Sequence, residues 1–457
     1  MRMQAASLPE RKGIHRAFAA ACLLHVVCVL GLGHYRQPVM MENGAIARNL
    51  LAGLGFVGAV FHPPPTPVGE DAGPASERAP VPRVMQLQPT SNQAPGYPLL
   101  LWTFWKILGD TPGSLLLLSL CQALMVSTIV YPVSWLTSRW FGAPAALLAA
   151  WLSAFLPPYA FFVTRFSSAS VSIACYPWLV AGWLSLTDDR SWRRTLLVSV
   201  ATGGAVLFDP VMLGVFGLVG LVLLARAVGQ RQRTALPRLV FAALAVVVVL
   251  LPWTVRNYRV HGRLVPIKNS FGKELWIGNN PQTTGSSVLP DGRTSVFSLY
   301  LPKALQLPAN VTEMDVMRHM QADALAFIRR DPAAFLWRTG QKILWFWTWV
   351  PARSLSSDSA RLEFRGLQQV YWGLLLALAA ASLRRLTRDY IVLLGIIAVV
   401  YSTTYGLTFV EHSRFRVGIE FVLIPAAAAS LTWLWQQWTG GRGRRSPIAT
   451  TPAGGER

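Results

Sequence analysis

The chain has 457 residues, of which 53% are hydrophobic and 14% are charged. Soluble domains carry about 25% charged residues, so this composition argues against a soluble protein. The formal net charge is +21. The basic residues fall in short clusters between apolar runs, a pattern that membrane topology explains without nucleic-acid binding. The four cysteines lie inside apolar runs without metal-ligand spacing, so no metal site is predicted; the sequence indicates no cofactor and leaves a divalent-metal requirement open.

Ten apolar runs are long enough, or nearly long enough, to cross about 30 Å of hydrocarbon as helices. They cover residues 17–33, 113–135, 143–157, 169–187, 195–208, 211–225, 239–254, 368–383, 390–408 and 417–436. The first run carries no small-residue cleavage site after it and is expected to stay as a helix. His25 within it is expected to hydrogen-bond to a neighbouring helix. The pattern predicts an all-α polytopic membrane protein with about ten transmembrane helices.

Short arginine clusters, such as Arg193–Arg194 and Arg384–Arg385, all fall on one side if ten helices alternate. The positive-inside rule makes that side cytoplasmic, so both termini are cytoplasmic and two long loops are periplasmic. The predicted parts are a cytoplasmic N-terminus with the first transmembrane helix (1–33), the first periplasmic loop (34–112) and transmembrane helices two to seven (113–254). They are followed by the second periplasmic loop (255–367), transmembrane helices eight to ten (368–436) and a cytoplasmic tail (437–457).

The first long loop contains two predicted helices in the membrane interface. One begins at Glu42, has apolar residues near helical spacing, and ends at Gly53 and Gly55. The other covers residues 97–108, which are apolar and aromatic but too few to span a bilayer. Between them, residues 62–92 are rich in Pro, Gly and polar residues and are predicted to form a flexible loop.

The second long loop opens with polar, turn-rich sequence. A helix is predicted over about residues 312–330. It is followed by an aromatic segment (FLWRTGQKILWFWTW) of the kind found at the level of lipid headgroups.

Three stretches resemble one known family. They are ENGAIARNLLAGLGF with the later APGYPLLLWTFWKILG, then PWTVRNYRVHGRLVPIKNSFGKELWIGNNP running on to AFIRRDPAAFLWRTGQKILWFW, and HSRFRVGIEFVLIP. With the hydropathy profile they resemble bacterial members of glycosyltransferase family 39, relatives of protein O-mannosyltransferases and aminoarabinose transferases in the GT-C superfamily. The resemblance implies a GT-C-like helical bundle in the bacterial inner membrane. It also implies an enzyme that transfers a hexosyl or pentosyl group from a polyprenyl-phosphate-linked donor to a lipid, glycan or protein acceptor at the periplasmic face.

Such a transfer needs a carboxylate to deprotonate the acceptor. The family usually has Asp at the start of the first loop, and here the nearby acid is Glu42. The resemblance implies that Glu42 is the general base of an inverting reaction. The alternative is an acid favoured by the dipole at the start of the following helix.

The transfer also needs cations for the departing phosphate. The candidates flank the seventh and last helices and are Arg256, Lys268, His412, Arg414 and Arg416. Ordinary anchoring of basic side chains at the interface is the alternative for them. An Arg416–Glu420 pair at i,i+4 is expected beside the phosphate role.

Four further residues are candidates for the donor or acceptor pocket, namely Tyr97, Asp209, Asn279 and Asn280. Each has a plainer interpretation. Tyr97 fits an interfacial aromatic belt, Asp209 fits a helix cap before Pro210, and the two asparagines favour turns.

Two other functions fit the same profile. A polymerase or ligase of surface polysaccharide also combines many spans with a large outer loop. A non-enzymatic lipid transporter or scaffold is the third possibility. A transporter should carry inverted repeats with broken helices, and the sequence shows no convincing repeat.

Overall fold

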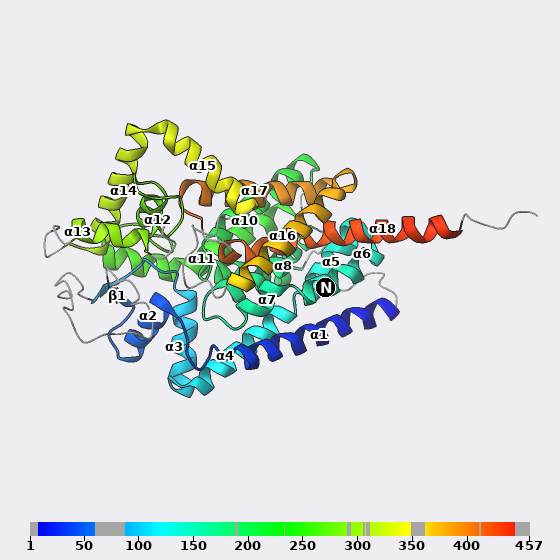
Figure 1. The fold of residues 1–457 in the computed structure, drawn as a ribbon, viewed down its shortest axis with the longest axis horizontal. Helices are drawn as coiled ribbons and strands as arrows, with labels where there is room; N and C mark the ends of the chain where they lie inside the picture. The colour runs from blue at the N-terminus through cyan, green and yellow to red at the C-terminus, as the bar shows by residue number, and fades with distance from the viewer. Residues whose placement is uncertain are drawn as a thin grey trace, which may run out of the picture.

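The computed structural model describes residues 8–59, 87–187, 191–232, 234–289, 294–304, 307, 311–348, 362–410 and 413–443. These residues are almost entirely helical, with one two-stranded sheet (Figure 1). The helices divide into a long bundle and a group of elements gathered at one end of it, here called the loop end.

The bundle is made of roughly aligned helices that surround a common core. They are α1 (Leu8–Leu32), α4 (Pro112–Ser127), α5 (Val130–Phe141), α6 (Ala143–Ala154), α7 (Pro157–Phe162), α8 (Ala169–Ser185), α9 (Trp192–Val206), α10 (Val211–Gly229), α11 (Leu236–His261), α16 (Leu362–Ala381), α17 (Arg388–Leu407) and α18 (Ile424–Gly443), with the short 3-10 segments η3 (Leu383–Arg385), η4 (Ser413–Phe415) and η5 (Val417–Val422).

The loop end comes from the two long segments of the sequence. It holds α2 (Met41–Leu51), α3 (Gly96–Leu108), α12 (Phe271–Gly278), η1 (Val296–Tyr300), α13 (Leu301–Ala304), α14 (Glu313–Arg330), and strands β1 (Val57–Ala59) and β2 (Leu87–Pro89), and α15 (Pro332–Trp347) leads from it back to the bundle. Both segments therefore lie at the same end, as two loops on one side of a membrane must. Which side that is stays a prediction.

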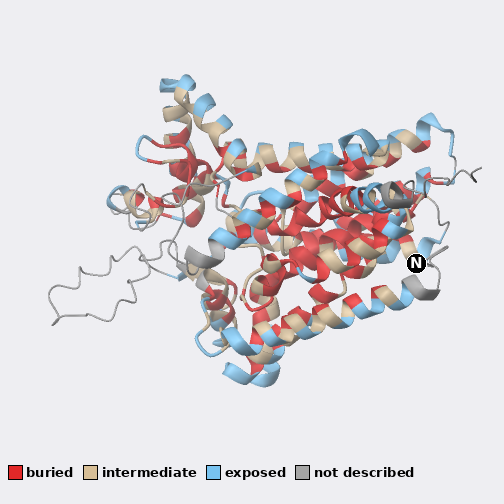
Figure 2. Ribbon diagram, turned by 45° about the vertical axis from the view of Figure 1, so that its right-hand side comes forward, coloured by how far each residue is buried: buried red, intermediate tan, exposed pale blue. Residues whose placement is uncertain are grey.

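Buried residues concentrate in the middle of the bundle, and the outward faces of the long helices are exposed and apolar (Figure 2). On α1, for example, Ala17 and Ala21 are buried whereas Leu23 and Val27 are exposed. An apolar face outside a packed core suits a lipid solvent.

Six of the described helical segments are long and apolar enough to cross a membrane, and three more apolar helices are shorter. The prediction of an all-α polytopic membrane protein is confirmed. The count of ten stays a prediction, because α9, which matches the run at 195–208, belongs to neither group.

The interfacial and capped helices of the loops form close to where they were predicted. Helix α2 ends before Gly53 and Gly55, whose φ angles of 75° and 85° favour glycine. Helix α14 begins after Thr312, whose side chain accepts a hydrogen bond from the backbone N–H of Asp315 in a capping box. In the bundle, the expected helix–helix contact of His25 is a 2.9 Å hydrogen bond between its Nδ1 and Ser127 Oγ.

The prediction of a flexible loop over 62–92 is wrong at its C-terminal end. Residues 87–89 form β2, which pairs antiparallel with β1, so that Val57 lies opposite Pro89. The part of that loop at 62–86 lies outside the described residues. Three-residue strands carry no alternating pattern that sequence analysis can detect.

The predicted topology is tested by cysteine labelling at two exposed positions, Lys303 in the loop end and Arg385 at the opposite end of the bundle. In intact cells a membrane-impermeant maleimide should modify Lys303→Cys but modify Arg385→Cys only after the membrane is opened. The unsubstituted chain provides the background. Labelling of Arg385→Cys in intact cells, with Lys303→Cys protected, would invert the topology.

Candidate functional site

Arg256, near the end of α11, binds the end of the small sheet at which β1 begins and β2 finishes. Its Nη2 donates to the carbonyl oxygen of Phe56 (2.8 Å) and its Nη1 to that of Thr90 (2.7 Å). The guanidinium also lies over the rings of Phe56 and Trp253, 5.3 and 4.9 Å from their centroids. Charged donors and aromatic faces make this a strong anchor. It fixes the start of the segment at 90–93 against the bundle.

The same segment is held from the second long loop by Glu313, the first residue of α14. Thr90 Oγ1 and the backbone N–H of Ser91 donate to the two carboxylate oxygens, the latter at 2.9 Å. Burial raises the pKa of Glu313, and these hydrogen bonds act against the rise. The backbone N–H of Asn269 donates to the carbonyl oxygen of Ser91 (2.7 Å). Residues 90–93 are therefore bound on two sides.

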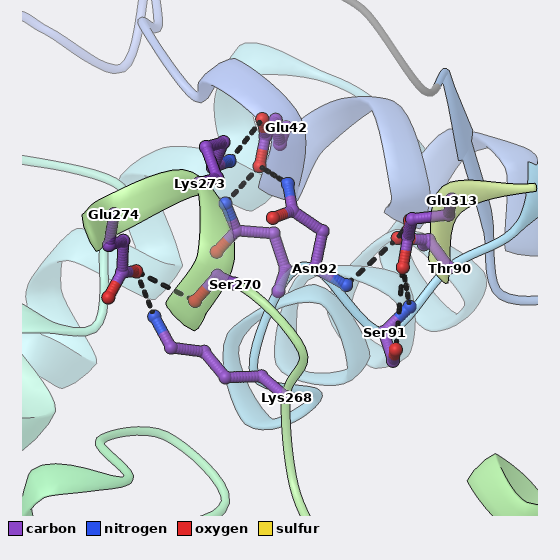
Figure 3. A network of polar contacts seen from close by, with 10 residues as sticks. Glu42, Thr90, Ser91, Asn92, Lys268, Ser270, Lys273, Glu274 and Glu313 are labelled. Carbon is purple, nitrogen blue, oxygen red and sulfur yellow. Dashed lines mark hydrogen bonds and ion pairs between the residues drawn. The ribbon is translucent and has the colours of Figure 1, made fainter. Parts of the chain in front are cut away.

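At the far end of this segment, two amide groups meet the carboxylate of Glu42 on α2 (Figure 3). Asn92 Nδ2 donates to Glu42 Oε2 at 3.1 Å, and Gln93 Nε2 donates to the same oxygen. Lys273 Nζ lies 3.7 Å from Glu42 Oε1. The side chain of Glu42 remains 22% exposed. Asn92 Oδ1 is shielded and accepts no hydrogen bond from the described residues.

Helix α12, which carries Lys273, packs closely between α14 and the end of α17. A Cβ added at Gly272 would lie 2.0 Å from the carbonyl oxygen of Met317 on α14. One added at Gly278 would lie 1.7 Å from the carbonyl oxygen of Thr408, just after α17. Neither site can hold a larger residue without backbone movement. The close packing fixes the backbone of α12 and therefore the Cα positions of its two charged residues.

The second charged side chain of α12, Glu274, binds Lys268. The two side chains are 2.8 Å apart, and Ser270 Oγ also donates to the carboxylate at 2.7 Å. Burial acts to raise the pKa of Glu274, but the charge and hydrogen bond of Lys268, with the hydrogen bond of Ser270, leave it below its ordinary value.

Lys268 also faces Asp209, between α9 and α10. Burial raises the pKa of Asp209, and the charge of Lys268 acts in the opposite direction. Asp209 accepts hydrogen bonds from Ser172 Oγ (3.0 Å) and from the backbone N–H of Val211 (3.2 Å). The second bond is the cap-like contact expected next to Pro210. Two of the predicted site residues, Lys268 and Asp209, thus interact through their charges.

Arg416 lies in a buried group at the start of the last helix. Its Nε donates to Glu420 Oε1 (3.4 Å), which confirms the predicted i,i+4 pair. Its Nη1 donates to the carbonyl oxygen of Phe346 (2.8 Å), and the guanidinium stacks 4.0 Å from the ring centroid of Trp372. Tyr371 donates to Glu420 Oε2. The side chain is therefore well packed, with 6% of its surface exposed.

The segment after Arg416 also contacts the surroundings of Asp209. A Cβ added at Gly418 would lie 3.1 Å from Ser172 Cβ, so η5 runs close against α8 at the residue that binds Asp209. Arg414 is exposed. His412 lies outside the described residues.

Tyr97, Asn279 and Asn280 serve internal contacts. Tyr97 is buried and donates to Gln122 Oε1 at 2.9 Å. Asn279 Nδ2 donates to the carbonyl oxygens of Leu275 and Leu407, at 2.8 and 2.6 Å. Asn280, two residues beyond α12, donates from its Nδ2 back to the carbonyl oxygen of Trp276 in that helix, at 2.9 Å. These contacts join α3 to the bundle and α12 to α17.

Sequence reasoning missed four residues that contact Glu42 or belong to or hold the segment at 90–93, namely Asn92, Gln93, Lys273 and Glu313. It also missed Glu274, which binds Lys268. Adjacent Lys273 and Glu274 were a usable signal, because a charged pair within an apolar helix needs partners on the protein. Within the ranges that the structure describes, no group of three His, Cys, Asp or Glu side chains could hold a metal ion.

No protein-family model and no curated protein matches the chain. Among solved structures it is similar to the archaeal oligosaccharyltransferase AglB from Archaeoglobus fulgidus, in complex with an inhibitory peptide and a dolichol-phosphate (10% identity, TM-score 0.49). That match covers 98% of this chain and 53% of AglB, so the chain spans about half the length of that protein. It is also similar to ArnT from Cupriavidus metallidurans bound to undecaprenyl phosphate (14% identity, TM-score 0.38) and in the apo state (12%, 0.36), with 96% of this chain and 81% of ArnT covered in each. Likenesses of this degree carry no functional argument.

Arg256→Ala should lower the stability of the protein, because two carbonyl oxygens lose a charged donor and each such bond is worth roughly 1.5–3 kcal/mol. Arg259→Ala, at an exposed position of the same helix, is the matched control and should change stability by less than about 0.5 kcal/mol. Thermal unfolding in detergent measures both. Equal melting temperatures for the two variants would contradict the anchoring role.

Proposed function

We propose that the chain is an inverting membrane glycosyltransferase with Glu42 as general base. It would move a sugar from a polyprenyl-phosphate-linked donor to a lipid, glycan or protein acceptor at the periplasmic face of a bacterial inner membrane. The observation that carries the proposal is the setting of Glu42: a partly exposed carboxylate at the loop end that accepts hydrogen bonds from two amides and lies near a lysine.

The chemistry follows from that setting. The acceptor hydroxyl or amine gives its proton to Glu42 as its oxygen or nitrogen attacks the anomeric carbon. The bond from that carbon to the phosphate oxygen breaks on the opposite face, and the phosphate leaves with the electron pair. Configuration at the carbon is therefore inverted.

Cations must offset the charge that grows on the departing phosphate. The proposal assigns this to Arg256, Lys268, Arg414 and Arg416, with His412. Arg416 has five N–H donors, and its contacts with Glu420 and Phe346 engage its Nε and Nη1 atoms, which leaves Nη2 for a phosphate oxygen. Arg256 would act mainly by placing the segment that holds Glu42.

The pocket residues differ in the support they have. Asp209 faces Lys268, so a role beside the leaving phosphate fits its surroundings. Tyr97, Asn279 and Asn280 make internal hydrogen bonds and would shape the pocket walls without binding the sugar directly.

Glu42→Gln keeps the shape of the side chain and its amide contacts but cannot accept a proton. Transfer should fall roughly 10²–10⁴-fold, mainly in turnover, because the acid acts in the transition state. Glu42→Asp should be intermediate. The measurement is transfer from a polyprenyl-phosphate-linked sugar by purified, level-matched protein.

Asp323→Asn is the control for that experiment, since Asp323 is a partly exposed carboxylate paired with Lys303 in the loop end. It should retain wild-type transfer. A Glu42→Gln rate within about threefold of wild type would remove Glu42 from the mechanism. A scaffold or transporter would show no transfer by either protein.

Arg416→Ala should strongly reduce use of the donor, because a charged hydrogen bond is worth roughly 1.5–3 kcal/mol. Arg416→Lys should recover only part of the donor use, because lysine keeps the positive charge but lacks the planar guanidinium. The apparent donor affinity and turnover of both variants are compared at matched protein level. Normal turnover in a double Arg414→Ala, Arg416→Ala variant would place the phosphate site elsewhere.

A further inference from the structure

Helix α15 presents one continuous apolar face to its surroundings. Leu336, Trp337 and Leu344 on this face are 67%, 75% and 60% exposed. Ala333 and Gly340 are exposed between or beside them, at the three- and four-residue spacing of one side of a helix. We call these five residues the outer stripe of α15. Every exposed residue of this helix is uncharged. A contiguous apolar surface of this kind marks contact with lipid or with another protein.

The two basic side chains of α15 lie on the opposite face and contact the protein. Arg338 Nη1 donates to the carbonyl oxygen of Asn280 at 2.7 Å, and its guanidinium lies 5.0 Å from the ring centroid of Phe327. Lys342 is fully buried, and its Nζ donates to the carbonyl oxygen of Thr408 at 2.7 Å. A helix at a water-exposed surface has the reverse arrangement, with apolar residues inward and basic residues outward. The reversal indicates that the outer stripe does not face water.

Contacts with α17 show how deep α15 reaches. Helix α17 is one of the segments long and apolar enough to cross a membrane. A Cβ added at Gly406, near the end of α17, would lie 2.9 Å from Ile343 Cγ1. Trp347 Nε1 donates to Ser402 Oγ at 2.8 Å, and Ser402 lies five residues before the end of α17, or about 7.5 Å along a helix. The C-terminal part of α15, which includes Leu344, therefore lies beside the last turns of a membrane-crossing helix (Figure 1).

The other end of α15 meets charged and exposed residues. Arg329 and Arg330 end α14, and Asp331 caps α15 by accepting a hydrogen bond from the backbone N–H of Ala334 at 2.9 Å. All three charged residues are exposed. Charged side chains belong at the level of lipid headgroups, and apolar side chains belong below it. From its charged start to its end beside α17, α15 has the order expected of a helix that enters a bilayer from the surface.

We infer that the outer stripe of α15 is a lipid-binding surface that lies among the acyl chains of the leaflet next to the loop end. The same acyl chains cover the exposed apolar face of α17, on which Val399 is 60% exposed, and continue onto α15. On its inner face, Arg338 and Lys342 bind Asn280 and Asn279, so the inserted helix holds the end of α12 at the membrane surface. The inference rests on the membrane fold and does not need the proposed transferase activity.

Spin labelling of full-length protein in lipid nanodiscs tests the inference. The four native cysteines are replaced by serine, and single cysteines carry the label. Leu344→Cys and Trp337→Cys report on the stripe. Lys303→Cys, at a side chain 53% exposed in the loop end, is the water control, and Val399→Cys is the lipid control.

The label at Leu344→Cys should collide with oxygen as often as the label at Val399→Cys does. It should collide with a polar nickel complex roughly tenfold less often than the label at Lys303→Cys, because polar groups enter hydrocarbon at a high cost in free energy. Trp337→Cys, nearer the surface, should have intermediate access to nickel. Melting temperatures close to that of the unlabelled protein show that each variant is folded.

Three results would overturn the inference. Nickel access at Leu344→Cys equal to that at Lys303→Cys would place the stripe in water. Low access to both oxygen and nickel would mean that protein covers the stripe, and dipolar broadening between labels would identify a second copy of the chain as the cover. Less nickel access at Trp337→Cys than at Leu344→Cys would reverse the direction in which α15 enters the bilayer.

Discussion

The loop end depends on the two hydrogen bonds that Arg256 donates to the backbone of Phe56 and Thr90. A sheet of two three-residue strands is too small to be stable alone, so its position must come from outside it. Arg256, at the end of α11, holds the sheet in position, and so does Glu313, in the second long loop, which accepts hydrogen bonds from Thr90 and Ser91. Because residues 90–93 are fixed in this way, Asn92 and Gln93 meet the carboxylate of Glu42.

The loop end concentrates charge in pairs. Glu42 and Glu313 accept hydrogen bonds from donors of a distant segment, and Glu274 accepts them from Lys268 and Ser270 in its own segment. Unpaired charges in a poorly solvated place are costly, so the pairing stabilises the loop end.

Much of the fold could be predicted from the sequence, because an apolar run and a capping residue are local signals. Thr312 starts α14, and the glycines at 53 and 55 follow the end of α2. The strand at 87–89 could not be predicted, since its stability comes from Arg256, far along the chain. Glu42 was identified by resemblance, but its partners were not, because two amides and a lysine from distant segments make no motif. The role of Arg256 on backbone carbonyls was missed for the same reason.

The most direct test of the account is the position of the phosphate in a structure of the protein with undecaprenyl phosphate in a lipid nanodisc. The account predicts phosphate density at the loop end, on the same side of the bundle as Glu42. Density at the opposite end of the bundle would contradict it.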